Sequence, residues 1–155
     1  MKTAVVISDS HGNISRLNEL KTIFAESDYI IHLGDTSSDG SAVRSEFPDK
    51  TAVINGNCDF IKLGEDEAVI EIENVKIFAT HGHLYSVKST LSKLAARAKE
   101  LNCSIALYGH THSAREDVIG GVTLINPGNL SKYSRNSYCY LVINGDKAVA
   151  KTVLL

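Results

Sequence analysis

The stretch "TAVVISDSHGN", residues 3–13, joins a short apolar run to an aspartate and a histidine that are two positions apart. A continuous apolar run of this length is typical of a strand that is covered on both faces. The runs "YIIHL" (29–33) and "SIALYG" (104–109) have the same character. We therefore expect three buried strands, with polar side chains where each of them ends.

Two segments carry apolar residues at helical spacing, and each one precedes a buried run. Residues 13–27 predict a helix that begins behind Asn13, a residue type that caps helices well. Residues 87–101 predict a second helix behind Ser86. Strand, helix and strand in succession are typical of parallel strand pairs.

Two further segments are predicted to be antiparallel hairpins. Residues 67–82 alternate around a turn at Glu73–Asn74, and residues 138–155 alternate around Asn144–Gly145. Parallel units combined with hairpins predict an α/β fold, a two-sheet mixed β-sandwich flanked by helices. No linker or repeat divides the chain, so we expect one domain over residues 1–155.

Composition excludes several classes of protein. The formal charge of −2 and pI near 6.3 give no general field that would attract nucleic acid. No apolar span is long enough to cross a membrane, and the first apolar run is too short for a signal peptide. Three cysteines without framework spacing indicate reduced thiols, and we expect a cytoplasmic protein.

Candidate metal ligands follow five of the predicted strands, in the motifs "DSH", "GD", "GNCD", "THGH" and "GHTH". Because strand ends gather at one edge of an α/β sheet, these residues can converge. The donors are oxygen and nitrogen, which suits Mn²⁺, Ni²⁺, Zn²⁺, Fe²⁺ or Co²⁺, and we take Mn²⁺ as the first choice. The seven candidate ligands are Asp9, His11, Asp35, Asn57, His81, His110 and His112.

Seven ligands are too many for one such ion. Two divalent ions per chain, about 3.5 to 4 Å apart and bridged by one carboxylate, would use all of them. Asp35, alone on its loop, is the natural bridge. An isolated Asp-x-His is more often simple turn chemistry, but the ordered set favours the metal site. His32, inside an apolar run, is expected to be a hydrogen-bonded structural imidazole.

The ordered motifs resemble those of the calcineurin-like metallophosphoesterases, and the short length with "GNCD" resembles the small YfcE-like phosphodiesterase branch. The resemblance implies a four-layer α-β-β-α fold and hydrolysis of a phosphodiester by a metal-bridging hydroxide. It also implies the ligand sets: Asp9, His11, Asp35 and His112 for one ion, and Asp35, Asn57, His81 and His110 for the other.

Cys58 departs from the family pattern, because many members have a histidine there that is thought to protonate the leaving oxygen. A thiol near cations could be partly ionised, which favours a diester with an acidic leaving group over a monoester. Asp59 is expected to orient the site through hydrogen bonds. The residues that we assign to catalysis are Asn57, Cys58, Asp59 and His81.

Three residues are assigned to the substrate side. His83 follows the "TH" pair and is expected to contact phosphate, with plain surface placement as the alternative. The segment "NPGN" at 126–129 resembles the family's "NPGS" loop, so Asn126 and Gly128 are expected to shape the pocket. Asn129 replaces the usual serine and is expected to influence substrate choice.

Two functions are compared. The first is a metal-dependent phosphodiesterase that acts on a small phosphodiester, with no specific nucleic-acid or membrane partner and with a homodimer as the expected assembly. The second is a protein-binding scaffold similar to the small retromer subunit, which has a related fold. A scaffold has no reason to gather seven polar ligands at one edge, so the complete set favours the enzyme.

Overall fold

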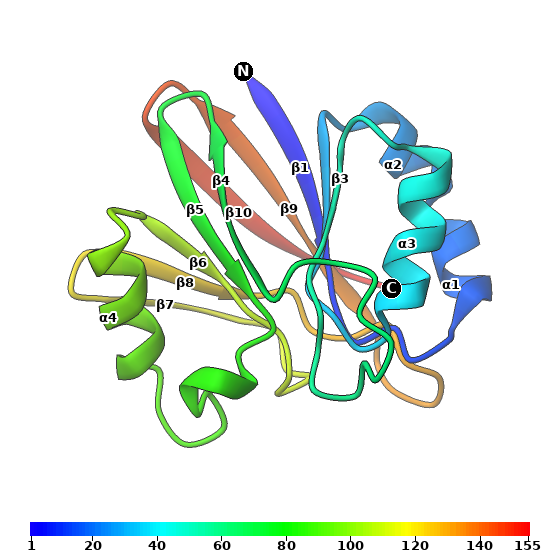
Figure 1. Cartoon of the computed structure of the whole chain (residues 1–155). Helices are drawn as coiled ribbons and strands as arrows, with labels where there is room; N and C mark the ends of the chain where they lie inside the picture. Colours follow the sequence, from blue (N-terminus) through cyan, green and yellow to red (C-terminus); the bar gives the residue numbers. More distant parts are fainter.

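The computed structural model describes all 155 residues and contains two five-stranded mixed sheets that pack face to face (Figure 1). The first sheet has the order β10-β9-β1-β2-β3 and the second β4-β5-β6-β8-β7. The strands of the first sheet are β1 (Lys2–Ile7), β2 (Tyr29–His32), β3 (Thr51–Val53), β9 (Ser137–Asn144) and β10 (Lys147–Leu154). Those of the second are β4 (Glu67–Ile72), β5 (Val75–Thr80), β6 (Ile105–Leu107), β7 (Arg115–Ile119) and β8 (Val122–Asn126).

Helices cover the outer faces of both sheets, which confirms the predicted sandwich with flanking helices (Figure 1). The helices on the first sheet are α1 (Ile14–Glu19), α2 (Lys21–Glu26) and α3 (Ser37–Glu46). The second sheet carries α4 (Ser92–Glu100), and a short 3₁₀ helix, η1 (His83–Tyr85), follows β5. None of these helices is long and apolar enough to span a bilayer.

The core has three buried clusters that correspond to these layers. The largest joins both sheets, with Val6 and Ile31 on one side and Ile77 and Leu107 on the other. The other two lie between each sheet and its helices. Burying each aliphatic side chain contributes about 1.5–3 kcal/mol, so the two sheets are held rigidly against each other.

Strand direction brings the loops of the motifs together. β1 runs parallel to β2, and β2 to β3, while β5, β6 and β8 are also mutually parallel. The loops that follow β1, β2, β3, β5 and β6 therefore emerge at one end of the sandwich. Both predicted hairpins are confirmed, with β4 paired to β5 and β9 paired to β10.

The helix predicted over residues 13–27 is interrupted, because α1 and α2 are separate helices that meet at Leu20. The Asn13 cap is confirmed, since its side chain accepts a hydrogen bond from the backbone N–H of Arg16 at 3.4 Å. Leu20 is itself buried and takes a near-helical conformation with ψ of −1°. The buried face continues across the break through Leu17, Leu20 and Phe24, whereas Ile14 is exposed.

The helix predicted over residues 87–101 was wrong at its start, because α4 begins at Ser92. Ser86 has a left-handed backbone with φ of 54°, which ends η1 and sends the chain into a turn. Thr90 then accepts a hydrogen bond from the backbone N–H of Ser92 at 3.2 Å. This local bond competes with an earlier helix start. Val87 is buried without being helical.

No pattern in the sequence indicates α3 or β7. The sequence of α3, "SSDGSAVRSE", is polar almost throughout, and of its apolar residues only Val43 is a buried aliphatic. Its Gly40 packs closely on Val53 and His32, so contact with the sheet depends on a missing side chain rather than on an apolar stripe. β7 is an exposed edge strand without a continuous apolar run.

Candidate metal centre

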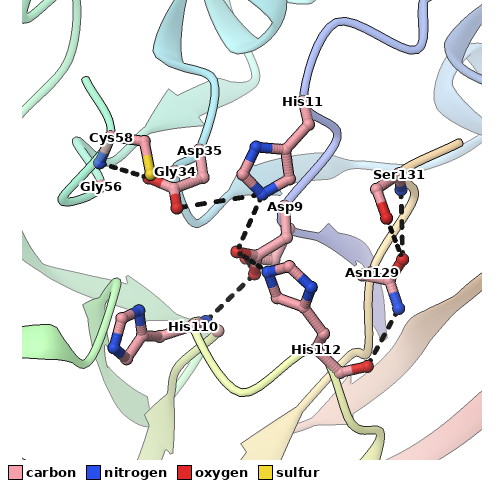
Figure 2. A network of polar contacts seen from close by, with 12 residues as sticks. Asp9, His11, Gly34, Asp35, Gly56, Cys58, His110, His112, Asn129 and Ser131 are labelled. Atoms are coloured by element: carbon pink, nitrogen blue, oxygen red, sulfur yellow. Dashed lines mark hydrogen bonds and ion pairs between the residues drawn. The ribbon is translucent and has the colours of Figure 1, made fainter. Parts of the chain in front are cut away.

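Most candidate ligands converge at the end of the sandwich where the parallel strands finish, and Figure 2 shows Asp9, His11, Asp35 and His112 close together. Asp9 follows β1, Asp35 follows β2, His81 follows β5, and His110 and His112 follow β6. Two groups of side chains have ligand atoms within 4.8 Å of one another: Asp9, His11 and His112, and Asp9, Asp35 and His81.

The carboxylate of Asp9 lies at the centre. Its Oδ1 is 3.1 Å from Nε2 of His112 and 3.8 Å from Nε2 of His11. Its Oδ2 accepts hydrogen bonds from the Ser8 hydroxyl at 2.5 Å and from the His110 backbone N–H at 3.0 Å. One oxygen thus fixes the side chain, while the other faces the imidazoles.

The carboxylate of Asp35 is arranged in the same way. Its Oδ1 accepts a hydrogen bond from the backbone N–H of Cys58 at 2.9 Å. Its Oδ2 is 3.4 Å from Nε2 of His81 and 3.9 Å from Nε2 of His11. Each carboxylate therefore keeps one oxygen among imidazole nitrogens, where it could bind a metal ion.

His81 presents one defined nitrogen to the carboxylates. The carbonyl oxygen of Leu33 accepts a hydrogen bond from Nδ1 of His81 at 2.7 Å, so the ring proton is on Nδ1. The lone pair of Nε2 therefore faces Asp9 and Asp35 in the neutral ring. A backbone carbonyl that fixes the tautomer in this way is the usual arrangement behind a metal-binding histidine.

Two buried polar atoms in this group have no hydrogen-bond partner: Oδ1 of Asp9 and Nε2 of His81. They lie 3.9 Å apart, too far for a hydrogen bond to each other. Leaving a buried donor or acceptor unpaired costs about 1–3 kcal/mol. A cation between the two would satisfy both atoms, and the residues present therefore fit a divalent metal ion.

The pKa values of the carboxyl groups favour the charged forms. Burial alone would raise the pKa of Asp9, but the close contact with the His112 imidazole and the neighbouring His81 outweigh it and hold the pKa below its usual value. The pKa of Asp35 is lowered further, because His81 and the Cys58 backbone outweigh its burial. Both side chains are therefore anionic ligands at neutral pH.

The pKa values of the imidazoles differ from one another. Despite burial, the pKa of His81 is raised, because Asp35 and Asp9 stabilise the cation. The close contact with the Asp9 carboxylate raises the pKa of His112. Burial and the neighbouring charge of His81 lower the pKa of His110. The imidazoles beside the carboxylates are thus the ones for which a metal ion must compete with protons.

Five of the candidate ligands have a left-handed backbone, with positive φ at Asp9, His11, Asp35, His110 and His112. Residues other than glycine adopt this conformation at a cost of order 1 kcal/mol or more, and such residues gather at functional sites. Gly109 lets the loops from the two sheets meet, because a Cβ there would contact the Ser8 hydroxyl and the Asp9 carboxylate.

His32 supports the loops that follow β1 and β2. Its Nδ1 accepts a hydrogen bond from the backbone N–H of Gly34, and its Nε2 is 2.9 Å from the Ser10 hydroxyl. The ring therefore donates to Ser10, which donates in turn to Asp39 at 2.7 Å. Asp39 also accepts from the backbone N–H of Gly12 at 2.8 Å. The fully buried imidazole thus links the Asp9 loop to the Asp35 loop.

Asp59 makes hydrogen bonds to the backbone beside the cluster. It is buried and accepts from the backbone N–H groups of Asp35 at 3.1 Å, Gly56 at 2.6 Å and Ser37 at 2.7 Å. It therefore clamps the loop after β2 to the loop after β3. It makes no contact with the imidazoles, and its role in the structure is positioning.

Asparagines support the loop that carries His110 and His112. Asn126 donates to the Gly109 carbonyl oxygen and to the Thr111 hydroxyl, at 3.0 Å in each case. Asn129 donates to the His112 carbonyl oxygen at 2.9 Å, and its own Oδ1 accepts from Ser131 (Figure 2). Both asparagines are buried and hold the backbone of the histidine loop, so neither side chain faces the ligand cluster.

Gly128 also shapes this loop, because it has φ of 89° and a Cβ would meet the Ser137 hydroxyl. His83 lies at the edge of the cluster, with its ring centroid 5.5 Å from that of His81. Its Nδ1 is buried and unpartnered. His110 is half-buried and packs edge-on against His81, with 5.2 Å between the ring centroids.

Asn57 and Cys58 are exposed and lie beside the cluster rather than in it. The Asn57 amide is 3.6 Å from the Cys58 sulfur, and no contact joins it to a candidate ligand. Burial, reinforced by Asp35, raises the pKa of the Cys58 thiol. The groups of the protein itself thus oppose the partial ionisation that nearby cations were expected to cause.

Sequence reasoning missed the supporting residues Ser10 and Asp39. Asp39 lies in the first turn of α3, a helix that has no apolar periodicity, so nothing in the sequence marked it as buried. His32 did leave a signal, because a polar residue inside a buried strand needs hydrogen-bond partners. The expectation of a hydrogen-bonded structural imidazole is confirmed.

Comparisons with known proteins agree with this geometry. A model of the calcineurin-like phosphoesterase superfamily domain matches residues 1–147. The "Probable metallophosphoesterase YsnB" of Bacillus subtilis (strain 168) is 37% identical over 151 residues, covering 95% of this chain and 88% of that protein. The phosphodiesterase YfcE of Escherichia coli (strain K12) is 24% identical over 157 residues, covering 84% and 80%.

Solved structures share the fold. A conserved protein of Streptococcus pneumoniae TIGR4, a predicted phosphoesterase, superposes with a TM-score of 0.84 at 28% identity, covering 99% of this chain and 89% of that one. Vps29 of Entamoeba histolytica, in a complex with zinc, superposes with a TM-score of 0.76 at 22% identity, covering 98% of both chains. The second likeness concerns the fold alone.

Proposed function

The chain belongs to the calcineurin-like phosphoesterase superfamily, and from this premise we propose that it is a phosphodiesterase that uses two divalent metal ions. Its relatives are metal-dependent phosphoesterases, and this chain is one as well. The observation that carries the proposal is the pair of buried, unpartnered atoms, Asp9 Oδ1 and His81 Nε2, that face each other among charged ligands.

The ligands divide into two proposed sets that share the carboxylate of Asp35. Asp9, His11, Asp35 and His112 would hold one ion. Asp35, His81 and His110 would hold the other together with Asn57, whose amide lies beside the cluster in this structure, and Mn²⁺ is the first choice. When bound, two such ions supply the chemistry of hydrolysis: they lower the pKa of a water molecule toward neutrality and offset charge on the phosphoryl oxygens.

The residues of the chain arrange this chemistry. Asp9 and Asp35 provide the negative charge that binds the cations, while His81 keeps its proton on Nδ1 and offers Nε2. Asp59 and His32 hold the loops, so that little reorganisation is needed when substrate arrives. His83, at the edge of the cluster, is proposed to donate a hydrogen bond to a non-bridging oxygen of the phosphodiester.

Cys58 bears on the choice of substrate. Its pKa is raised, and its backbone N–H is already used by Asp35. A thiol with a raised pKa is a weaker proton donor than an imidazolium. We therefore propose a small phosphodiester with an acidic leaving group as substrate, rather than a monoester with a poor one. A cytoplasmic location agrees with three free cysteines, and a homodimer stays a prediction.

The test uses chelator-stripped protein and an activated aryl phosphodiester beside the matching monoester. Mn²⁺, Ni²⁺, Zn²⁺ and Mg²⁺ are restored one at a time, and Asp35→Asn is measured next to the control Asp146→Asn. Asp146 is an exposed aspartate in the β9–β10 turn, at the opposite end of the sandwich. We expect metal-restored diesterase activity in the wild type and in the control, and none in Asp35→Asn.

The alternative is a protein-binding scaffold on the same fold. If the wild-type protein binds metal and hydrolyses neither ester with any ion, the diesterase proposal fails and the scaffold is favoured. Equal activity in Asp35→Asn and in the control would instead show that the activity does not come from this cluster.

A further inference from the structure

A polar hollow lies beside the candidate metal centre. It has a volume of about 270 Å³ and is lined by Val87, Lys88, Tyr108, Thr111, Ser113 and Arg115. Thr111 separates His110 from His112, so one rim of the hollow is the histidine loop itself. The other rim comes from the turn between η1 and α4 and from the start of β7.

The cations of this hollow are incompletely paired. Lys88 is exposed and has neither an ion-pair nor a hydrogen-bond partner. It lines the same hollow as Thr111, the residue between His110 and His112. Arg115 uses Nε and Nη2 on Asp117, at 2.7 and 2.8 Å, which leaves Nη1 without a partner.

Hydroxyl groups complete the lining. The Thr111 oxygen accepts hydrogen bonds from Asn126 and Ser113, so its own proton is free to be donated. Tyr108 is fully buried, and its hydroxyl has no hydrogen-bond partner. Burial raises the pKa of Tyr108 to about 12, so the hydroxyl keeps its proton. Tyr108 and Arg115 line the same hollow.

We propose that this hollow binds a second phosphate group, carried by the alcohol part of the phosphodiester substrate. Ammonium, guanidinium and hydroxyl donors around one small space are the groups that recognise phosphate. An unpartnered buried hydroxyl gains a hydrogen bond when the anion is present. The assignment rests on the proposed function, and it narrows the substrate class to diesters with an additional anionic group.

The first test needs no catalysis. Inorganic phosphate is titrated into chelator-stripped protein, and the backbone amide resonances of Thr111 and Ser113 are followed by NMR. We expect saturable shifts, and about tenfold weaker binding in Lys88→Met, as for the loss of one charge-assisted contact. The control is Lys99→Met, an exposed lysine in the last turn of α4, away from the hollow. Absence of shifts, or equal affinity in both variants, overturns the proposal.

Tyr108→Phe is a second variant that should fold, because it removes only a buried unpartnered hydroxyl. It should weaken phosphate binding while leaving thermal stability unchanged or higher. Unchanged phosphate affinity in Tyr108→Phe would show that the tyrosine hydroxyl does not bind the phosphate.

The second test compares two substrates: the p-nitrophenyl ester of thymidylate, and the same ester with an extra phosphate on the free sugar hydroxyl. Lys88→Met should raise KM about tenfold for the doubly phosphorylated ester alone. An equal change for both esters contradicts the assignment. If the wild type hydrolyses neither ester, the proposed function fails, while the phosphate titration still decides whether the hollow binds an anion.

Discussion

The two sheets contribute different chemistry to the same cluster. The first sheet supplies both carboxylates, the almost completely buried Asp9 and Asp35, together with the imidazole of His11. The second sheet supplies imidazoles only, among which the His112 side chain is 42% exposed. The first-sheet loops are held by carboxylates and a buried imidazole, Asp59, Asp39 and His32. The histidine loop of the second sheet is held by neutral amides.

This difference indicates which loops are held more firmly. Hydrogen bonds to charged groups contribute about 1.5–3 kcal/mol, compared with about 1 kcal/mol for neutral pairs. The carboxylates, whose mutual repulsion must be controlled before a cation binds, are thus fixed more firmly than the imidazoles. We therefore expect changes on the first-sheet side to lower metal affinity more than changes on the second-sheet side.

A loss as severe as that in Asp35→Asn is expected for Asp9→Asn, because the Asp9 carboxylate lies in both groups of clustered ligand atoms. Loss of the charge should lower kcat/KM for an aryl phosphodiester about a thousandfold, since each tenfold step corresponds to about 1.4 kcal/mol and metal catalysis supplies several. Steady-state kinetics with saturating Mn²⁺ checks this. Activity within tenfold of the Asp146→Asn control would contradict the central position of Asp9.

His32→Leu breaks the link between the two first-sheet loops without touching a candidate ligand. We expect Mn²⁺ affinity to fall about 10- to 100-fold, as for other residues that orient metal ligands. Calorimetric titration of folded protein, verified by circular dichroism, measures the change. An unchanged affinity in a folded variant would show that the loops hold their positions without His32.

Lowering the pH distinguishes the carboxylates from the imidazoles, because only the imidazoles take up protons near neutral pH. The pKa values of Asp9 and Asp35 are lowered, so both carboxylates stay ionised, while the pKa values of His81 and His112 are raised above the ordinary value of about 6.5. A cation binds the neutral imidazole. The affinity for Mn²⁺ should therefore be highest at alkaline pH and should fall as the pH drops through the raised histidine pKa values. Competition titrations between pH about 5 and 8 measure this. A pH-independent affinity would exclude the two imidazoles as ligands.

Asn129→Ala tests the second-sheet side. It removes the neutral hydrogen bond to the His112 carbonyl, and we expect Mn²⁺ affinity to fall only about fivefold, corresponding to about 1 kcal/mol. The same calorimetric titration applies. A loss as large as that of His32→Leu would reverse the comparison between the two sides.

The smallest effect is expected for Cys58→His, which places an imidazole beside the cluster. The exposed position accepts the larger ring, and we expect diesterase activity to change little while the ratio of monoester to diester hydrolysis rises severalfold. Parallel assays with the two aryl esters give the ratio. An unchanged ratio would show that the choice between diester and monoester does not depend on a proton donor at position 58.

Much of this molecule could be predicted from its sequence. The buried runs at β1, β2 and β6 and the turns at Glu73 and Gly145 each carry a local signal. α3 carries none, because its contact with the sheet uses Gly40 and buried polar groups in place of an apolar stripe.

The candidate site divides in the same way. Its ligand types were visible as motifs, and five of the seven candidates lie together in the structure. Their support was not visible, because the hydrogen bonds of Ser10 and Asp39 join residues 29 positions apart and depend on the fold. Asn57 is the opposite case. It occupies a ligand position in the motif, but its amide does not lie among the other donors in the structure.

The most direct measurement is the number of metal ions bound per chain. Chelator-stripped wild-type protein, Asp35→Asn and Asp146→Asn are dialysed to equilibrium against Mn²⁺, and metal and protein are quantified together. The account predicts two ions per chain for the wild type and the control, and fewer than two for Asp35→Asn, because Asp35 belongs to both proposed ligand sets. A single ion per wild-type chain, or two ions retained by Asp35→Asn, would contradict the shared carboxylate.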